Sequence, residues 1–209
     1  MSIPRSSVGL VLVVLFVTLA GCAGPKPAVP PYVATDAEIN PIESHTPPYP
    51  TIGTIVRHDP RLDALLPDDA TIDVLAEGLV WAEGPVWVKD HLLFSDIPPN
   101  AIYKWSPNKG ASVWMRPSGY TGDEARTGEP GTNGLTLSPK GKLVAAAHGD
   151  REVFQLDCMC WPNGPRTTLA SHYMGKRFNS PNDVVYHSNG DLYFTDPPYG
   201  LQKRMDDPA

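Results

Sequence analysis

The sequence has no excess of basic residues: 17 lysines and arginines stand against 23 aspartates and glutamates, for a net charge of −6. Binding to nucleic acid depends on a basic patch or stripe, so a nucleic-acid partner is not expected. The sequence also leaves little room for long helices, because its 24 prolines recur every few residues after the first segment. These shortages make an all-β fold the expectation.

The longest apolar run, from Val8 to Ala20, falls short of the roughly 20 residues that a membrane-spanning helix needs. With Arg5 before it, the run has the character of a signal peptide. It ends in Leu19-Ala20-Gly21-Cys22, which resembles the lipobox of bacterial lipoproteins. The resemblance implies a lipoprotein signal peptide over residues 1–22, with Cys22 as the lipidation site. An ordinary secretory signal with a chance cysteine is the alternative.

Lipidation of Cys22 implies a protein anchored in the cell envelope and facing the periplasm. Ala23, in place of an aspartate, favours the outer membrane if the source is Gram-negative. Each buried methylene contributes about 0.8 kcal/mol, so several acyl chains form a stable anchor. Residues 23–66 are predicted to be a Pro-rich linker and lead-in, an extended tether followed by a short helical turn near Arg61. The folded domain is predicted over residues 67–209.

Three segments of the chain share a pattern that recurs every 49 residues. Each segment has a strand, a polar turn and a second strand, and the first two segments continue into a third and a fourth strand. The predicted first strands are Gly84–Val88, Asn133–Leu137 and Asn182–Tyr186, and the second strands are Leu92–Asp96, Leu143–Ala147 and Leu192–Asp196. The outer strands are predicted at Ala101–Trp105, Ser112–Trp114, Glu152–Leu156 and Arg166–Leu169.

A unit of about 40–50 residues with four short strands is typical of a β-propeller blade. The prolines and β-branched runs exclude helical solenoids of similar period. An immunoglobulin-like sandwich has no reason to repeat at a fixed interval. The sequence therefore predicts an all-β β-propeller. About three blades are present, which is half of a six-bladed ring, so the chain is interpreted as truncated.

An oxygen-bearing side chain lies where each copy enters its first strand, namely Glu83, Asn133 and Asn182. Loops that enter equivalent inner strands of a propeller meet at one mouth of its channel. A carboxylate and amide carbonyls that converge there suit Ca²⁺, or a divalent transition ion when fewer ligands are used. The alternative for a single loop asparagine is an ordinary turn residue.

Five motifs together resemble the gluconolactonase/regucalcin (senescence marker protein) family: Ala82–Trp87, Leu93–Pro98, Thr132–Thr136, Asn179–Val185 and Tyr193–Gly200. The resemblance implies a six-bladed propeller and hydrolysis of sugar lactones. It also implies a divalent metal cofactor, Ca²⁺ first, with Zn²⁺ or Mn²⁺ as alternatives.

The resemblance further implies that Glu83 and Asn182 bind the metal, and that Asn133 contacts substrate or a metal-bound water. The family's remaining ligand, an aspartate that is also the favoured general base, is expected beyond Ala209. Asp183 has two interpretations, a site residue or a local cap of the loop, and the cap is favoured.

The connection from Gly119 to Gly131 is longer than the chain needs, which favours a loop that overhangs the channel and selects substrate. Its candidate contact residues are Tyr120, Asp123 and Glu124. His148, one residue after a second strand, is predicted to be a turn residue without a catalytic role.

Several other residues are predicted to be structural. Asp96 and Asp196 follow second strands and are interpreted as turn formers. Trp81, Trp87 and Trp105 are predicted to pack between blades rather than stack on a ligand. Cys158 and Cys160 are poorly spaced for a disulfide with each other and are predicted to be free thiols.

Two functions are compatible with these patterns. The first is a metal-dependent lactonase with a small-molecule lactone as substrate and the membrane as a partner through the lipid anchor. The second is a non-catalytic envelope lipoprotein that uses the propeller as a platform for sugar acids or proteins. The set of Glu83, Asn133 and Asn182 favours the enzyme.

Overall fold

The computed structural model describes residues 41–203 except 108, 125 and 161. The predicted signal peptide and Cys22 lie outside the described residues. The described residues form antiparallel sheets and a single 3₁₀ helix, which confirms the all-β prediction. Within this part of the chain, no helix has the length and apolar character to cross a bilayer.

The first sheet is a four-stranded antiparallel meander of β3 (Ala82–Val88), β4 (His91–Asp96), β5 (Ala101–Ser106) and β6 (Gly110–Met115). Val88 pairs with His91, so the β3–β4 hairpin closes over only two residues. Lys89 in this turn has a φ of 55°, the left-handed conformation that a two-residue hairpin demands. The tight turn fixes the register of the two strands.

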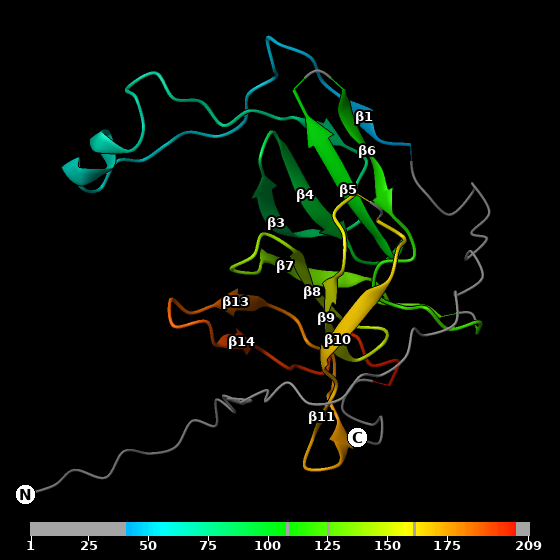
Figure 1. The fold of residues 1–209 in the computed structure, drawn as a ribbon. Coiled ribbons are helices and arrows are strands. Elements are labelled where there is room, and N and C mark those ends of the chain that lie inside the picture. The colour runs from blue at the N-terminus through cyan, green and yellow to red at the C-terminus, as the bar shows by residue number, and fades with distance from the viewer. Residues whose placement is uncertain (1–40, 108, 125, 161, 204–209) are drawn as a thin grey trace, which may run out of the picture.

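The second sheet repeats this arrangement with β7 (Thr132–Leu137), β8 (Leu143–Ala147), β9 (Glu152–Leu156) and β10 (Arg166–Ala170). A hairpin of β11 (His172–Tyr173) and β12 (Lys176–Arg177) follows, and then the pair β13 (Val184–Tyr186) and β14 (Leu192–Phe194). Figure 1 shows the sheets one after another from top to bottom, with β3, β7 and β13 on the left. These strands confirm the predicted repeat.

The sheets are joined by apolar cores on both faces of the second sheet. Leu143 and Ala145 of β8 pack toward the first sheet, against residues that include Leu93 and Ile102. Val144, which lies between them in β8, belongs to the core that covers the third strand pair. Successive residues of a strand point to opposite faces, so a strand covered on both faces is continuously apolar. The run Leu-Val-Ala-Ala-Ala therefore marks a central strand.

The chain before β3, residues 41–81, is called the lead-in from here on, and part of it covers the other face of the first sheet. β1 (Glu43–Ser44) pairs with β2 (Ala76–Glu77). The 3₁₀ helix η2 (Pro60–Ala64) lies between these two strands in the sequence. Apolar side chains of the lead-in pack against the first sheet, among them Ile42, Tyr49, Leu75 and Leu79. The linker prediction did not include this packing, because its proline-rich composition gives no sign of the sheet that it covers.

None of the three tryptophans that were predicted to pack between blades lies between two of the described sheets. Trp81 is 58% exposed and Trp87 is 54% exposed, whereas Trp105 is 7% exposed. Val86 and Val88 of β3 face the second sheet, so Trp87 between them points away from it. Trp105 lies in the core beneath the lead-in, with its ring 6.3 Å from that of Tyr49.

The prediction of free thiols at Cys158 and Cys160 is also wrong. The two residues form a disulfide, with their Cα atoms 5.3 Å apart. Two residues of an extended strand would place these atoms roughly 7 Å apart. The chain instead turns at residues 159–160, which brings the two Cα atoms to a separation that a disulfide bridges.

Candidate functional site

The three predicted oxygen donors lie at the starts of neighbouring first strands. Glu83 is in β3, Asn133 is in β7, and Asn182 lies two residues before the first residue of β13. β7 lies between β3 and β13 and contacts both. The fold therefore gathers one donor from each repeat at one end of three adjacent strands.

Two matched bulges bring these strand starts together. The β3–β4 register shifts between Glu83 and Val86, and the β7–β8 register shifts between Thr132 and Leu135. A bulge adds a residue that bends the strand and redirects side chains. Because both bulges fall at the same place in the repeat, they direct each strand start in the same way.

The backbones of consecutive repeats touch at the bulges. A Cβ atom on Gly84 would lie 2.1 Å from the carbonyl oxygen of Asn133, and one on Gly134 would lie 2.7 Å from the carbonyl oxygen of Asn182. The Gly134 N–H donates a hydrogen bond to this Asn182 oxygen over 2.6 Å. The glycines therefore set the spacing between the donors.

Each of the three side chains keeps an oxygen that is free of protein partners among the described residues. One carboxylate oxygen of Glu83 accepts a hydrogen bond from the Trp81 indole N–H at 2.9 Å, and the other has no hydrogen bond. Asn133 is 5% exposed, and its amide makes no hydrogen bond although its main-chain carbonyl accepts one from Ser95 at 2.8 Å. The Oδ1 atom of Asn182 is likewise without a donor.

This set of free oxygens fits a hard divalent cation. Within the described part of the chain, no three His, Cys, Asp or Glu side chains gather as a metal site. A cation at these strand starts would therefore be held by one carboxylate and amide oxygens, the ligand types that Ca²⁺ accepts. Glu83 supplies the only formal negative charge among the three.

His148 is the site neighbour that the sequence did not reveal. Its side chain is fully buried, and its Nε2 lies 3.5 Å from the Nδ2 of Asn182. Its Nδ1 lies 3.5 Å from a carboxylate oxygen of Glu129 without a normal hydrogen bond. Burial lowers the pKa of His148 to about 4, so the imidazole is neutral at neutral pH and the Glu129 contact is not an ion pair.

The prediction of a plain turn residue at position 148 is therefore incomplete. His148 directly follows β8, and its N–H donates to the Gly131 carbonyl, at the place in the repeat where Asp96 ends β4. The repeat thus locates His148 on the side of the sheet that carries the oxygen donors. Only the packing of the next repeat against it shows that its ring reaches Asn182.

The loop predicted to select substrate is anchored at this same end of the sheets. Thr121 donates to Asp150 at 2.7 Å, and Arg126 donates to the carbonyls of Gly149 and Gly200 at 2.7 Å each. The Arg126 guanidinium lies 5.1 Å from the centre of the Tyr120 ring, so Tyr120 helps Arg126 to anchor the loop. The remaining candidates, Asp123 and Glu124, are exposed.

The two aspartates interpreted as turn formers hold the chain segments that enter their own sheets. Asp96 accepts hydrogen bonds from the N–H groups of Val80 and Trp81, at 3.1 and 2.8 Å. Asp196 accepts one from the N–H of Asn179 at 2.8 Å. The turn interpretation is corrected accordingly, since these bonds span 15 to 17 residues.

Asp183 accepts a hydrogen bond from the Val184 N–H at 2.8 Å, which matches the interpretation as a local cap of the loop.

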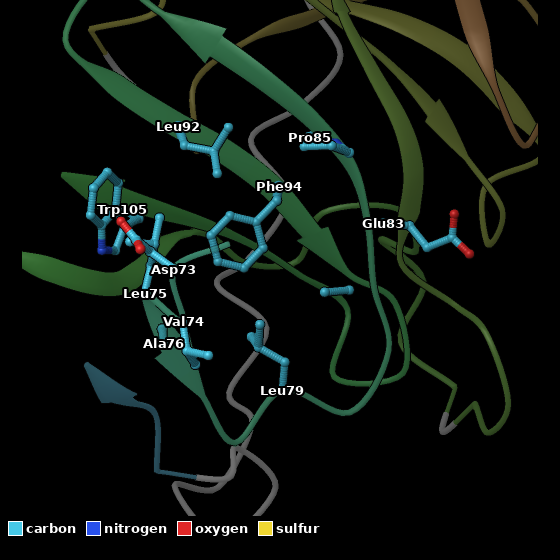
Figure 2. A pocket seen from close by; sticks show the side chains of 11 residues that line it. Asp73, Val74, Leu75, Ala76, Leu79, Glu83, Pro85, Leu92, Phe94 and Trp105 are labelled. Carbon is cyan, nitrogen blue, oxygen red and sulfur yellow. The ribbon is translucent and has the colours of Figure 1, made fainter. Parts of the chain in front are cut away.

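An apolar hollow of about 410 Å³ lies beside the candidate site and is distinct from it. It opens on the face of the first sheet that the lead-in partly covers, between side chains such as Leu79, Phe94 and Trp105. Figure 2 shows Glu83 at its edge, with the carboxylate pointing away from these apolar groups. The Glu83 charge is therefore directed out of the hollow.

Successive four-stranded sheets, with donors at the starts of their first strands, define a propeller-like β protein. The sequence profile of the SMP-30/Gluconolactonase/LRE-like region matches residues 81–209. The chain is 44% identical over 155 residues to a gluconolactonase of Zymomonas mobilis subsp. mobilis, which covers 72% of this chain and 43% of that protein. The chain therefore belongs to the SMP-30/gluconolactonase/LRE-like family.

Two solved structures resemble the fold. One is XC5397, a gluconolactonase of Xanthomonas campestris, with a TM-score of 0.56 at 26% identity, covering 87% of this chain and 50% of the other. The second was assigned provisionally as a gluconolactonase and gives a TM-score of 0.58 at 32% identity, covering 78% and 48% of the two chains. The chain thus spans about half the length of the relatives it matches.

Proposed function

We propose that the protein hydrolyses sugar lactones, with a divalent cation held by Glu83 and Asn182 beside Asn133. The observation that carries this proposal is the free oxygen on each of three side chains at adjoining strand starts. The relatives named gluconolactonase support the lactone as the substrate class. Ca²⁺ is the proposed cofactor, with Zn²⁺ or Mn²⁺ as alternatives.

Hydrolysis adds a water oxygen to the lactone carbonyl carbon, breaks the ring C–O bond and leaves a hydroxy acid. When bound, a divalent cation stabilises the negative charge that develops on the carbonyl oxygen and lowers the pKa of a water molecule. The proton of the attacking water would go to a carboxylate base. The ring oxygen takes up a proton as it leaves.

The described residues have separate parts in this reaction. Glu83 would hold the cation and offset part of its charge, and the cation would stabilise the developing oxyanion. The main-chain carbonyl of Asn133 accepts a hydrogen bond from the Ser95 hydroxyl, and its side-chain amide N–H groups are left to orient a substrate oxygen. Asn182 adds an oxygen ligand without further charge. This division follows from the side-chain chemistry of the three residues.

The proposal is tested by metal removal. Purified protein should release acid from glucono-1,5-lactone, lose this activity after treatment with a chelator, and regain it with Ca²⁺, Zn²⁺ or Mn²⁺. Unchanged turnover after chelation would overturn the metal. Absence of hydrolysis by the metal-loaded protein would overturn the lactonase, and binding of a sugar acid without hydrolysis would indicate the platform instead.

We also propose that the protein is lipid-anchored in the cell envelope through Cys22. The Leu-Ala-Gly-Cys sequence supports this location. Incorporation of labelled palmitate into the protein, abolished by Cys22→Ser, is the expected result. Equal release of the wild type and this variant into the soluble fraction would exclude the anchor.

A further inference from the structure

We infer that His148 is a positioning residue that fixes the orientation of the Asn182 amide, so that its oxygen rather than its NH₂ group faces the cation. This inference rests on the proposed function. It concerns a fully buried residue of the second repeat and a ligand candidate of the third. The contact therefore joins two repeats at the site.

The direction of the contact follows from donor chemistry. The Nδ2 atom of Asn182 can only donate, so the facing Nε2 of His148 must be the unprotonated, accepting nitrogen. The imidazole proton then lies on Nδ1, which faces the Glu129 carboxylate at 3.5 Å. The ring is thus an acceptor toward Asn182.

The backbone of Asn182 is fixed by hydrogen bonds, so the orientation of its side-chain amide is what remains to be set. Its N–H donates to Thr195 at 2.9 Å, and its carbonyl accepts from Gly134 at 2.6 Å. An asparagine amide can be turned to present either oxygen or nitrogen, and only the oxygen binds a cation. With Nδ2 held by His148, Oδ1 is on the opposite side of the amide and has no protein donor among the described residues.

The ring itself has no room to move. A Cβ atom on Gly200 would lie 2.4 Å from the Cβ of His148, so this glycine packs directly on the histidine. Gly200 is in turn held by Arg126 and by the hydroxyl of Ser180. His148 therefore packs against a glycine that is itself held in place, which suits the supporting partner of a ligand.

The test compares two replacements of His148 by calorimetric titration of the metal-free protein with Ca²⁺. His148→Leu fills the space without an acceptor and should weaken Ca²⁺ binding about tenfold, the usual cost of losing a supporting partner. His148→Gln restores an acceptor oxygen and should recover most of the affinity. His172→Leu, on the exposed β11, should bind like the wild type.

A double-mutant cycle separates positioning from packing. If His148 acts through Asn182, then His148→Leu should add no further loss in an Asn182→Ala background. Wild-type affinity in His148→Leu, equal losses in the Leu and Gln variants, or full additivity would each overturn the inference. If the inference fails in one of these ways but the wild type binds Ca²⁺, the proposed function still stands. If the wild type does not bind Ca²⁺, both the inference and the proposed function are overturned.

A second readout does not depend on how well the variants fold. Two-bond ¹H–¹⁵N spectra of the wild type distinguish a bare imidazole nitrogen from a protonated one. The expected spectrum has the proton on Nδ1 and a bare Nε2. A protonated Nε2 would overturn the inference, because the Asn182 NH₂ group could not then donate to it.

Discussion

The two sides of the candidate site are held in different ways. Glu83 is exposed, and one hydrogen bond from Trp81 holds it. Asn133 and Asn182 are held by main-chain bonds within and between the repeats, and Asn182 also contacts the buried His148. The charged ligand candidate is thus the loosely held one. The neutral amides, which attract a cation less strongly, are the ones set in place by the fold.

This difference has a physical reason. A carboxylate attracts a cation over a distance and can adjust to it, whereas an amide dipole contributes only if its oxygen is already oriented. Burial of a lone carboxylate would also cost several kcal/mol without a bound ion. The exposed glutamate, the buried Asn133 and the half-buried Asn182 therefore each occupy an environment that suits their charge.

Loss of the charge at Glu83 should have the largest effect. Glu83→Gln keeps the shape but removes the negative charge, and we expect kcat/KM for lactone hydrolysis to fall on the order of 1,000-fold, since several kcal/mol of charge stabilisation depend on the cation. The measurement is steady-state kinetics with added Ca²⁺. Asp69→Asn, a change of the same kind at an exposed position of the lead-in, should leave activity unchanged. Similar activity in the two variants would contradict the role of Glu83.

On the side of the two amides, a change in the spacing between the backbones of neighbouring repeats should destabilise the protein. Gly84→Ala places a Cβ atom 2.1 Å from the Asn133 carbonyl oxygen, so the repeats must separate, at a cost of about 3 kcal/mol in the free energy of unfolding. Gly141→Ala is the matched control, because Gly141 also has a positive φ but has no neighbour within 4 Å of its Cβ position. Its cost should be about 1 kcal/mol from the left-handed backbone alone. Equal denaturant midpoints for the two variants would show that the close approach is unimportant.

The exposed side should respond weakly to loss of its hydrogen bond. Trp81→Phe removes the donor to Glu83, and we expect Ca²⁺ affinity to fall about fivefold, which corresponds to about 1 kcal/mol. Trp87→Phe is the control, since Trp87 is similarly exposed and donates instead to the Lys89 carbonyl. A loss in Trp81→Phe larger than that in His148→Leu would reverse the comparison between the two sides.

The smallest effect concerns the two aspartates that anchor the incoming segments. Both oxygens of Asp96 accept hydrogen bonds, whereas one oxygen of Asp196 is buried without a partner. Burial raises the pKa of Asp196 above its usual value near 3.8, so its favourable contribution is complete below this value and is lost as the pH rises through the higher folded-state pKa.

Asp196→Asn should therefore gain stability relative to the wild type as the pH rises through that window. Urea unfolding from about pH 3 to about pH 7 measures the difference between the two proteins. Asp69→Asn should show no such trend. A difference between Asp196→Asn and the wild type that stays constant with pH would contradict the raised pKa.

The strands could be predicted because their signals are local. Val184–Tyr186 and Leu192–Phe194 combine β-branched and aromatic residues around an Asn-Gly turn, and the structure pairs them as a hairpin. The same pattern at a fixed period predicted the other two sheets. The predictions for Trp87, Cys158 and Cys160 were wrong because they depended on which face a side chain takes and on how a loop turns.

The repeat, the family and the positions of Glu83, Asn133 and Asn182 could all be read from the sequence, since strand propensity, turn residues and spacing are local properties of the chain. Which of these side chains is held, and by which partner, depends on the three-dimensional packing. The contact of His148 with Asn182 joins residues 34 apart, and the approach of Gly84 to Asn133 joins two sheets. Such contacts depend on the packing of one repeat against the next, which no single segment of the sequence contains.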